Sequence, residues 1–87
     1  MSELSINKKS LKWQCRRGML ELDGLFDLFL EECYEPLTNE QKQAFYNLLQ
    51  EDDPFIYEWL FCDVPAPQDL EQIVHDIIKW RKTAFRT

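Results

Sequence analysis

Apolar residues recur every three or four positions along most of this 87-residue chain, which is the spacing of an amphipathic helix. The clearest stripe predicts a helix over about residues 19–34. Its apolar face is formed by Met19, Leu22, Phe26, Phe29 and Cys33, and it is widened by Leu25 and Leu30. Gly24 lies inside this helix at a cost of about 1 kcal/mol relative to alanine. We expect this glycine to permit close approach of another helix.

A shorter helix is predicted before this one, over about residues 5–17, with Ser5 as its N-cap. Arg16 and Arg17 fall in its last turn, where cations suit the negative end of the helix dipole. Gly18 follows directly, and we expect it to take the left-handed conformation that often ends a helix. The two arginines and the glycine therefore mark a junction between two helices.

Three further helices are predicted from their start and stop signals. Residues 38–41 have the Thr-x-x-Gln spacing of a capping box. Asp53, followed by a proline, is expected to be the N-cap of the fourth helix. Residues 64–67 form a proline-containing connector before the last helix, which we expect to end near Lys82 with a frayed tail.

These segments predict an all-α protein, a compact bundle of about five short helices. We expect a single domain over residues 1–87, with its core at about residues 5–82. A domain this short buries only about 60–65% of its unfolded surface, so bulky side chains must supply much of the core. The side chains expected there are Trp13, Trp59, Trp80, Phe26, Phe29, Phe45, Phe55 and Phe61.

Charge is distributed unevenly along the chain, whose formal net charge is −6. Residues 1–17 hold five cations and one acid, residues 79–87 hold four cations, and the residues between hold one cation and 15 acids. A long acidic middle disfavours binding to nucleic acid, which usually requires a dominant basic face. No apolar run approaches the roughly 18 residues of a membrane span. Because the N-terminus also lacks a signal or transit segment, we expect the protein to stay in the cytoplasm, where it is made.

Metal-binding and catalytic patterns are weak. Three widely spaced cysteines and one histidine predict neither a zinc site nor a disulfide framework, and we expect buried or half-buried thiols, with Cys15 inert. His75 lacks a partner at helical spacing, which favours a surface role over catalysis. The acidic run at residues 51–53 lacks the alternate-oxygen spacing of a calcium loop. We therefore predict no metal site and no catalytic residue.

The densest polar cluster is Arg17, Gly18 and Glu21, an Arg-Gly-x-x-Glu sequence at the predicted helix junction. The bland interpretation is a surface ion pair between Arg17 and Glu21, worth about 0.2–1 kcal/mol. The alternative is a docking edge, with Glu21 forming a charge-assisted hydrogen bond to a partner. Met19 and Trp13 would then supply apolar contact area beside it.

The chain resembles the small succinate dehydrogenase assembly factors known as the flavinator family, over about residues 8–81. The residues that carry the resemblance are Trp13, Arg16, Arg17, Gly18, Met19, Glu21, Leu22 and Asp23, then residues 48–54, and then Trp59 with Leu60. The resemblance implies a five-helix bundle that is not an enzyme. It implies binding to the flavoprotein subunit of succinate dehydrogenase, and of fumarate reductase, to promote covalent attachment of FAD to a histidine of that subunit.

The family's Arg-Gly-x-x-Glu signature is matched by Arg17, Gly18 and Glu21, and this implies that they bind the flavoprotein. We expect Trp13, Arg16, Met19 and Asp52 to contribute to the same surface. FAD is expected to be handled through the partner, with none bound tightly by this chain, and the chain is expected to be a monomer.

The sequence leaves three alternative functions open. The chain could be a small regulatory module, antitoxin-like or associated with nucleic acid, that uses its basic ends and binds with steep salt dependence. It could be a small enzyme that uses His75. It could also be an interaction module for some other flavoprotein.

Overall fold

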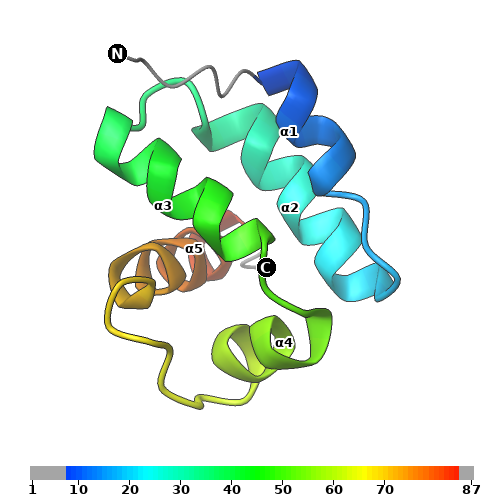
Figure 1. Cartoon of the computed structure of the whole chain (residues 1–87), viewed down its shortest axis with the longest axis vertical. Coiled ribbons are helices and arrows are strands. Elements are labelled where there is room, and N and C mark those ends of the chain that lie inside the picture. The colour runs from blue at the N-terminus through cyan, green and yellow to red at the C-terminus, as the bar shows by residue number, and fades with distance from the viewer. Residues whose placement is uncertain (1–7, 85–87) are drawn as a thin grey trace.

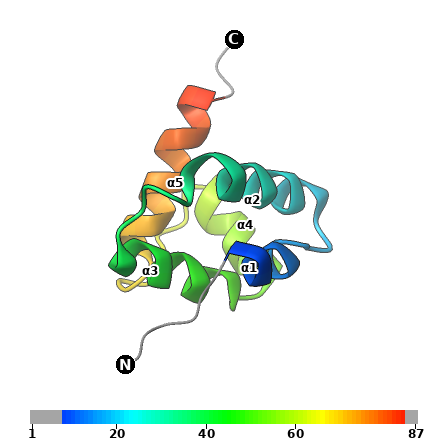
Figure 2. The ribbon, with the colours of Figure 1, turned by 90° about the horizontal axis from the view of Figure 1, so that it is seen from above.

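The computed structural model describes residues 8–84 and contains five α-helices in that range, which confirms the all-α prediction. The helices are α1 (Lys8–Gln14), α2 (Leu20–Cys33), α3 (Asn39–Leu49), α4 (Asp53–Phe61) and α5 (Glu71–Ala84). α1 lies along α2, and α5 packs against both α3 and α4 (Figure 1). The last turns of α5 project beyond the other helices (Figure 2).

The core is formed by apolar faces of all five helices, and no polar or charged residue of the described range is buried in it. Aromatic rings pack at its centre. The Phe45 ring lies 5.9 Å from Phe26 and 5.2 Å from Phe29, measured between ring centroids. Trp80 of α5 packs edge-on against Phe29 at 5.2 Å. Such tilted and edge-on pairs add to the stabilisation from buried area.

Three of the eight bulky side chains expected in the core lie at the surface instead. Trp13 is 74% exposed, Phe55 52% and Phe61 37%. For these residues the prediction was wrong, because aromatic content alone does not say which face of a short helix points inward. Their exposure leaves apolar area on α1 and on α4.

The start of α3 agrees with the prediction. The Thr38 hydroxyl accepts a hydrogen bond from the Gln41 backbone N–H at 3.1 Å, and the Gln41 side-chain oxygen accepts one from the Thr38 N–H at 2.8 Å. This reciprocal pair is the capping box, and it satisfies two donors that the first turn of a helix leaves unpaired.

The end of α1 differs from the prediction. The helix stops at Gln14, so Arg16 and Arg17 lie in the connecting loop rather than in its last turn. Gly18 does not adopt a left-handed conformation, and among the described residues only Asp63 has a positive φ, of 61°. The loop therefore has to be held by contacts other than a helix-terminating glycine. The expected N-cap, Ser5, lies outside the described residues.

Two further expectations about helices need correction. A Cβ built at Gly24 would meet no neighbouring atom within 4 Å, so no helix of this protein approaches the glycine. The last helix continues past Lys82 to Ala84, with the Thr83 hydroxyl donating to the Lys79 carbonyl at 3.2 Å. The residues beyond Ala84 lie outside the described range.

Within residues 8–84, none of the helices combines the length and the apolar character that crossing a lipid bilayer requires.

Candidate functional site

Arg17 lies in the loop between α1 and α2 and joins three segments of the chain. Its Nε donates to Asp53 Oδ1 at 2.8 Å, and its Nη1 donates to the carbonyl oxygens of Gln14 at 2.7 Å and Leu49 at 3.0 Å. Its Nη2 donates to the Glu51 carbonyl at 2.9 Å. The Arg17 side chain is only 10% exposed, and its Cζ lies 5.9 Å from the centre of the Phe26 ring. The guanidinium therefore ties the loop to the α3–α4 junction.

Asp53 is the partner of this arginine and of the next residue. Its Oδ2 accepts a hydrogen bond from the Gly18 backbone N–H at 3.2 Å, while Oδ1 takes the Arg17 Nε. The N-cap of α4 is Asp52, and it forms no side-chain capping bond. The expected capping role of Asp53 is therefore wrong: its carboxylate is used between segments 35 residues apart rather than within its own helix.

Glu21 does not pair with Arg17, so the interpretation of a surface ion pair between them is wrong. Glu21 lies exposed in the first turn of α2, and its side chain forms no hydrogen bond or ion pair with another described residue. It borders a groove whose other walls include Leu28 on α2, Phe61 on α4 and Arg81 on α5. The carboxylate is thus accessible from outside, beside apolar surface.

Gly18 and Met19 connect Arg17 to α2. Gly18 is exposed, and only the Asp53 carboxylate approaches the position of its missing Cβ, at 3.9 Å. Met19 is the N-cap of α2 with an extended backbone, and its side chain packs partly against the core. The backbone at Gly18 is therefore open to a partner, while Met19 is divided between the core and the surface.

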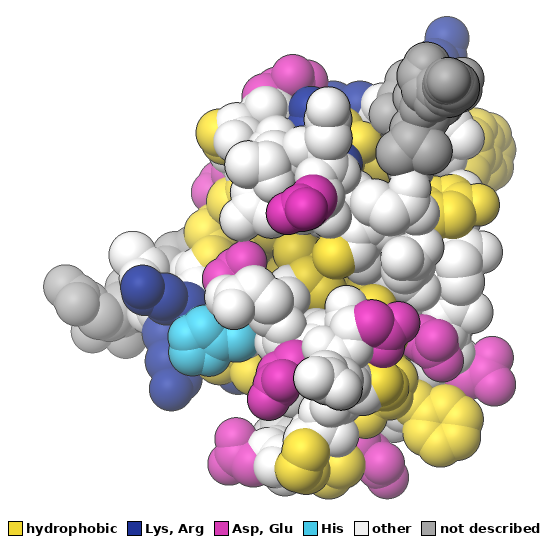
Figure 3. Space-filling model, turned by 60° about the vertical axis from the view of Figure 1, so that its left-hand side comes forward, with side chains coloured by type: hydrophobic (Ala, Val, Ile, Leu, Met, Phe, Trp, Pro, Cys, Tyr) yellow, Lys and Arg dark blue, Asp and Glu magenta, His cyan; other side chains and the backbone are white. Residues whose placement is uncertain are grey.

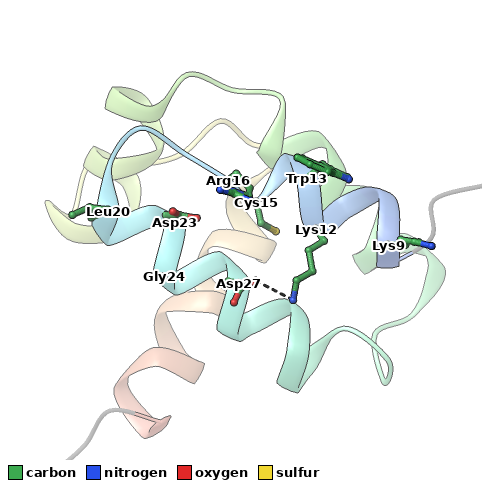
Figure 4. A pocket seen from close by; sticks show the side chains of 9 residues that line it. All are labelled: Lys9, Lys12, Trp13, Cys15, Arg16, Leu20, Asp23, Gly24 and Asp27. Atoms are coloured by element: carbon green, nitrogen blue, oxygen red, sulfur yellow. Dashed lines mark ion pairs between the residues drawn. The ribbon is translucent and has the colours of Figure 1, made fainter.

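A second groove, of about 640 Å³, lies between α1 and the start of α2. Figure 4 shows Trp13 and Leu20 on opposite sides of it, and these side chains are 74% and 81% exposed. The Arg16 guanidinium lies 5.9 Å from the Trp13 ring. Leu20 was not among the predicted site residues. Its position outside the apolar stripe of α2 is the signal that could have revealed it, since an apolar residue there has no core to face.

Lys12 also lines this groove but is already paired. Its Nζ donates to Glu31 Oε2 at 2.8 Å and lies 3.4 Å from Asp27 Oδ1. The hydrogen bond to Glu31 is the main cause that raises the pKa of Lys12, and it likewise lowers the pKa of Glu31. These ion pairs join α1 to α2, so Lys12 stabilises the two walls of the groove.

The other candidate residues, an acid, two cysteines and the histidine, lie in different environments. Asp52 is exposed and lines an open groove with Arg17 and Phe55 at the start of α4. Cys15 is buried, and burial raises the pKa of its thiol to about 12, which keeps it protonated and unreactive. Cys62 is exposed, contrary to the expectation of buried or half-buried thiols. His75 lies on the exposed side of α5, and the described residues contain no cluster of potential metal ligands.

The fold and the site together define a small helical protein whose distinctive surface is a rigid loop flanked by exposed apolar and acidic groups. Such a surface is typical of proteins that act by binding another protein. Residues 9–81 match the model of a family described as flavinator of succinate dehydrogenase, and the chain belongs to this family.

The names of individual relatives agree with this family assignment. The chain is 43% identical over 70 residues to a protein named FAD assembly factor SdhE from Coxiella burnetii, covering 79% of this chain and 85% of that protein. It is 42% identical over 77 residues to a protein of the same name from Colwellia psychrerythraea, covering 87% and 85%. A third, from Aliivibrio fischeri, is 51% identical over 53 residues, covering 61% and 62%.

Proposed function

We propose that this protein binds the flavoprotein subunit of succinate dehydrogenase and promotes covalent attachment of FAD to it, without catalysing the step itself. The same surface would accept the related flavoprotein of fumarate reductase. Membership of the flavinator family supports the partner, and the bacterial relatives support a bacterial setting, which we take to be the cytoplasm.

The proposed mechanism rests on a difference between the residues of the Arg-Gly-x-x-Glu sequence: the arginine is bonded within the protein, and the glycine and the glutamate are exposed. Four of the five N–H donors of the Arg17 guanidinium form hydrogen bonds within the protein. Gly18 and Glu21, in contrast, stay exposed next to it. Arg17 is thus a positioning residue. It holds the loop so that the Gly18 backbone and the Glu21 carboxylate reach the partner without further ordering, which reduces the entropic cost of binding.

Glu21 is the group best suited to a polar contact across the interface. An exposed carboxylate without an internal partner can accept a charge-assisted hydrogen bond from an arginine, lysine or backbone N–H of the flavoprotein. Trp13, Arg16, Met19 and Leu20 would surround this contact with apolar and cationic area. The complex would hold the flavoprotein so that its histidine and flavin remain within reacting distance.

The starts of α2 and α4, the helices that follow and face the Arg17 loop, are poorly suited to the diphosphate of FAD. Binding a diphosphate usually requires a glycine-rich loop or a helix N-terminus free of acids. Here the start of α2 carries Glu21 and Asp23, and the start of α4 carries Asp53, which is committed to Arg17. FAD, which supplies the ring that becomes bonded to the histidine, is therefore proposed to belong to the partner.

The test is co-expression of the flavoprotein subunit with variants of this chain, followed by flavin fluorescence of the denatured subunit in a gel. Glu21→Ala should strongly reduce covalent flavin while leaving the fold intact, because the Glu21 side chain forms no hydrogen bond or ion pair with the other described residues. Glu32→Ala, an exposed acid on the same helix, is the matched control. Unchanged fluorescence with Glu21→Ala would remove Glu21 from the site, and unchanged fluorescence without the chain would refute the function.

A role based on nucleic acid finds no support in the charge distribution. Lys12 pairs with Asp27 and Glu31, Arg17 pairs with Asp53, and Arg81 donates to the Leu60 carbonyl at 2.8 Å. Figure 3 shows acidic side chains scattered over one face, with basic ones gathered at its edge beside the histidine. On this face there is no continuous basic surface of the kind that a phosphate backbone requires.

A further inference from the structure

The outer face of α4 is unusually apolar for a helix at the surface. Three residues of α4 are buried, yet Phe55 and Phe61 on the outer side are 52% and 37% exposed. Tyr57, half-buried, stacks on Phe61 with ring centroids 4.9 Å apart. Only two residues of the helix are charged, and one of them, Asp53, is paired with Arg17. A helix that is apolar nearly all round is normally covered on both sides.

One end of this face already carries a cation from within the chain. The Arg81 guanidinium lies over the Phe61 ring, with Cζ 4.5 Å from the ring centroid, and donates to the Leu60 carbonyl. Arginine over an aromatic face is a favourable arrangement that strengthens when water is excluded. This contact shows how a basic side chain is accommodated on α4.

The other end, around Phe55, has no such cation among the described residues. The Phe55 ring stacks on Trp59 at 6.3 Å, and no positive group lies over it. Glu51 and Asp52 line the same groove as Phe55, and Glu58 follows Phe55 by three positions on the helix, which places it on the neighbouring surface. None of these three acids forms an ion pair within residues 8–84. An exposed aromatic ring bordered by unpaired acids is complementary to a basic side chain with an apolar stem.

We propose that the outer face of α4 is a second docking surface, which binds a lysine- or arginine-bearing segment of the flavoprotein; this rests on the proposed function. The segment would place a cation among Glu51, Asp52 and Glu58, with its apolar part against Phe55. A groove of about 630 Å³ lined by Arg17, Asp52 and Phe55 joins this face to the Arg-Gly-x-x-Glu loop, so one partner can contact both. The same acids repel nucleic acid and anionic membranes.

The experiment measures the affinity of the purified flavoprotein subunit for this chain by calorimetry at low and at high salt. Phe55→Ser should weaken binding about tenfold at both salt concentrations, since it removes an aromatic contact. Glu58→Gln should weaken it about twofold to fivefold at low salt and have no effect at high salt, where the charge is screened. Glu32→Gln makes the same charge change on α2 and should have no effect. Circular dichroism verifies that each variant is folded.

Each other result overturns the proposal in a recognisable way. Affinities of Phe55→Ser and Glu58→Gln within twofold of the unmodified chain would show that α4 is not in the interface, while flavinylation that depends on Glu21 would still stand. An effect of Phe55→Ser alone would show an occupant that is not basic. Self-association of the unmodified chain that Phe55→Ser abolishes would assign the face to a second copy. No binding by the unmodified chain would refute the proposed function itself.

Discussion

At the scale of single residues, Arg17 shows how one side chain can serve both fold and function. Its guanidinium bonds to Asp53 and to three carbonyl oxygens, two at the ends of α1 and α3 and one in the connection between α3 and α4. A planar fork with five donors suits this geometry, whereas a lysine could satisfy only part of it. The polar cluster recognised in the sequence therefore contains a structural residue beside exposed ones.

Replacing Arg17 with alanine should destabilise the protein by about 2–4 kcal/mol, because it removes the charged partner of the half-buried Asp53 carboxylate and the donor to three carbonyls, and leaves Asp53 only the Gly18 N–H. Urea unfolding monitored by circular dichroism would measure this change. Arg16→Ala is the matched control, since Arg16 is exposed and its guanidinium forms no hydrogen bond or ion pair with the described residues, and it should change stability by less than about 0.5 kcal/mol. Equal stabilities of the two variants would contradict the role given to Arg17.

The three thiols should react in an order set by their burial. Cys62 is exposed and should react first with Ellman's reagent at pH 8, followed by the half-buried Cys33. Cys15 should react only when the protein unfolds, because burial excludes the reagent and raises the thiol pKa to about 12. Quantifying released thiolate with and without urea checks this order. Reaction of all three cysteines in the native protein would show that the α1–α2 contact opens readily.

Whether a side-chain interaction could be predicted from the sequence depended on how far apart its two residues lie along the chain. Caps, such as that of Thr38, involve residues three apart and could be predicted from spacing. The Arg17–Asp53 pair joins residues 36 apart, so it depends on how the α1–α2 loop packs against the start of α4, which no local pattern specifies. The sequence therefore suggested the nearby Glu21 as an ion-pair partner of Arg17, and this interpretation was wrong.

At the scale of helices, periodicity predicted the bounds of α2 closely, because a long amphipathic segment repeats its signal over several turns, and the capping box predicted the start of α3. The shorter helices were harder. α1 spans only seven described residues and ends three residues earlier than expected, and α4 is too apolar for its inner face to be distinguished by pattern. The apolar faces that these two helices leave exposed are the ones we assign to binding.

Gly24→Ala should stabilise the protein by about 1 kcal/mol, because alanine favours the helix and the added Cβ meets no atom within 4 Å. The midpoint of urea unfolding would report the gain. A loss of stability would mean that the start of α2 is not regular helix. Comparing the affinity of this variant for the flavoprotein with that of the unmodified chain would show separately whether a partner approaches the backbone at this position.

At the scale of the whole molecule, apolar side chains of the described helices are buried within one chain, so we expect it to fold without a second copy. Leu11, Leu22, Phe26, Phe45 and Ile77 are each fully buried, and they come from four different helices. The exposed apolar side chains lie in separate places, on α1 and the start of α2 and on α4. We therefore expect a monomer that presents more than one contact area to a larger partner.

Sedimentation equilibrium should accordingly give a mass near 10.5 kDa for the isolated chain. With the flavoprotein subunit added, a complex of one copy of each is expected, because both proposed contact areas would engage the same partner. A dimer of the isolated chain at micromolar concentration would contradict this prediction. Phe55→Ser and Leu20→Ser would then show which of the two areas forms the dimer.

The contacts of Arg17 also affect how genetic experiments on this protein should be interpreted. A chain that loses several kcal/mol of a typical stability of about 5–15 kcal/mol spends more time unfolded, and cellular proteases remove such chains. An Arg17 variant that fails to restore enzyme assembly in a cell could therefore have been degraded before meeting its partner. Glu21 variants do not carry this ambiguity, so a comparison of protein abundance between the two separates loss of the factor from loss of its interface.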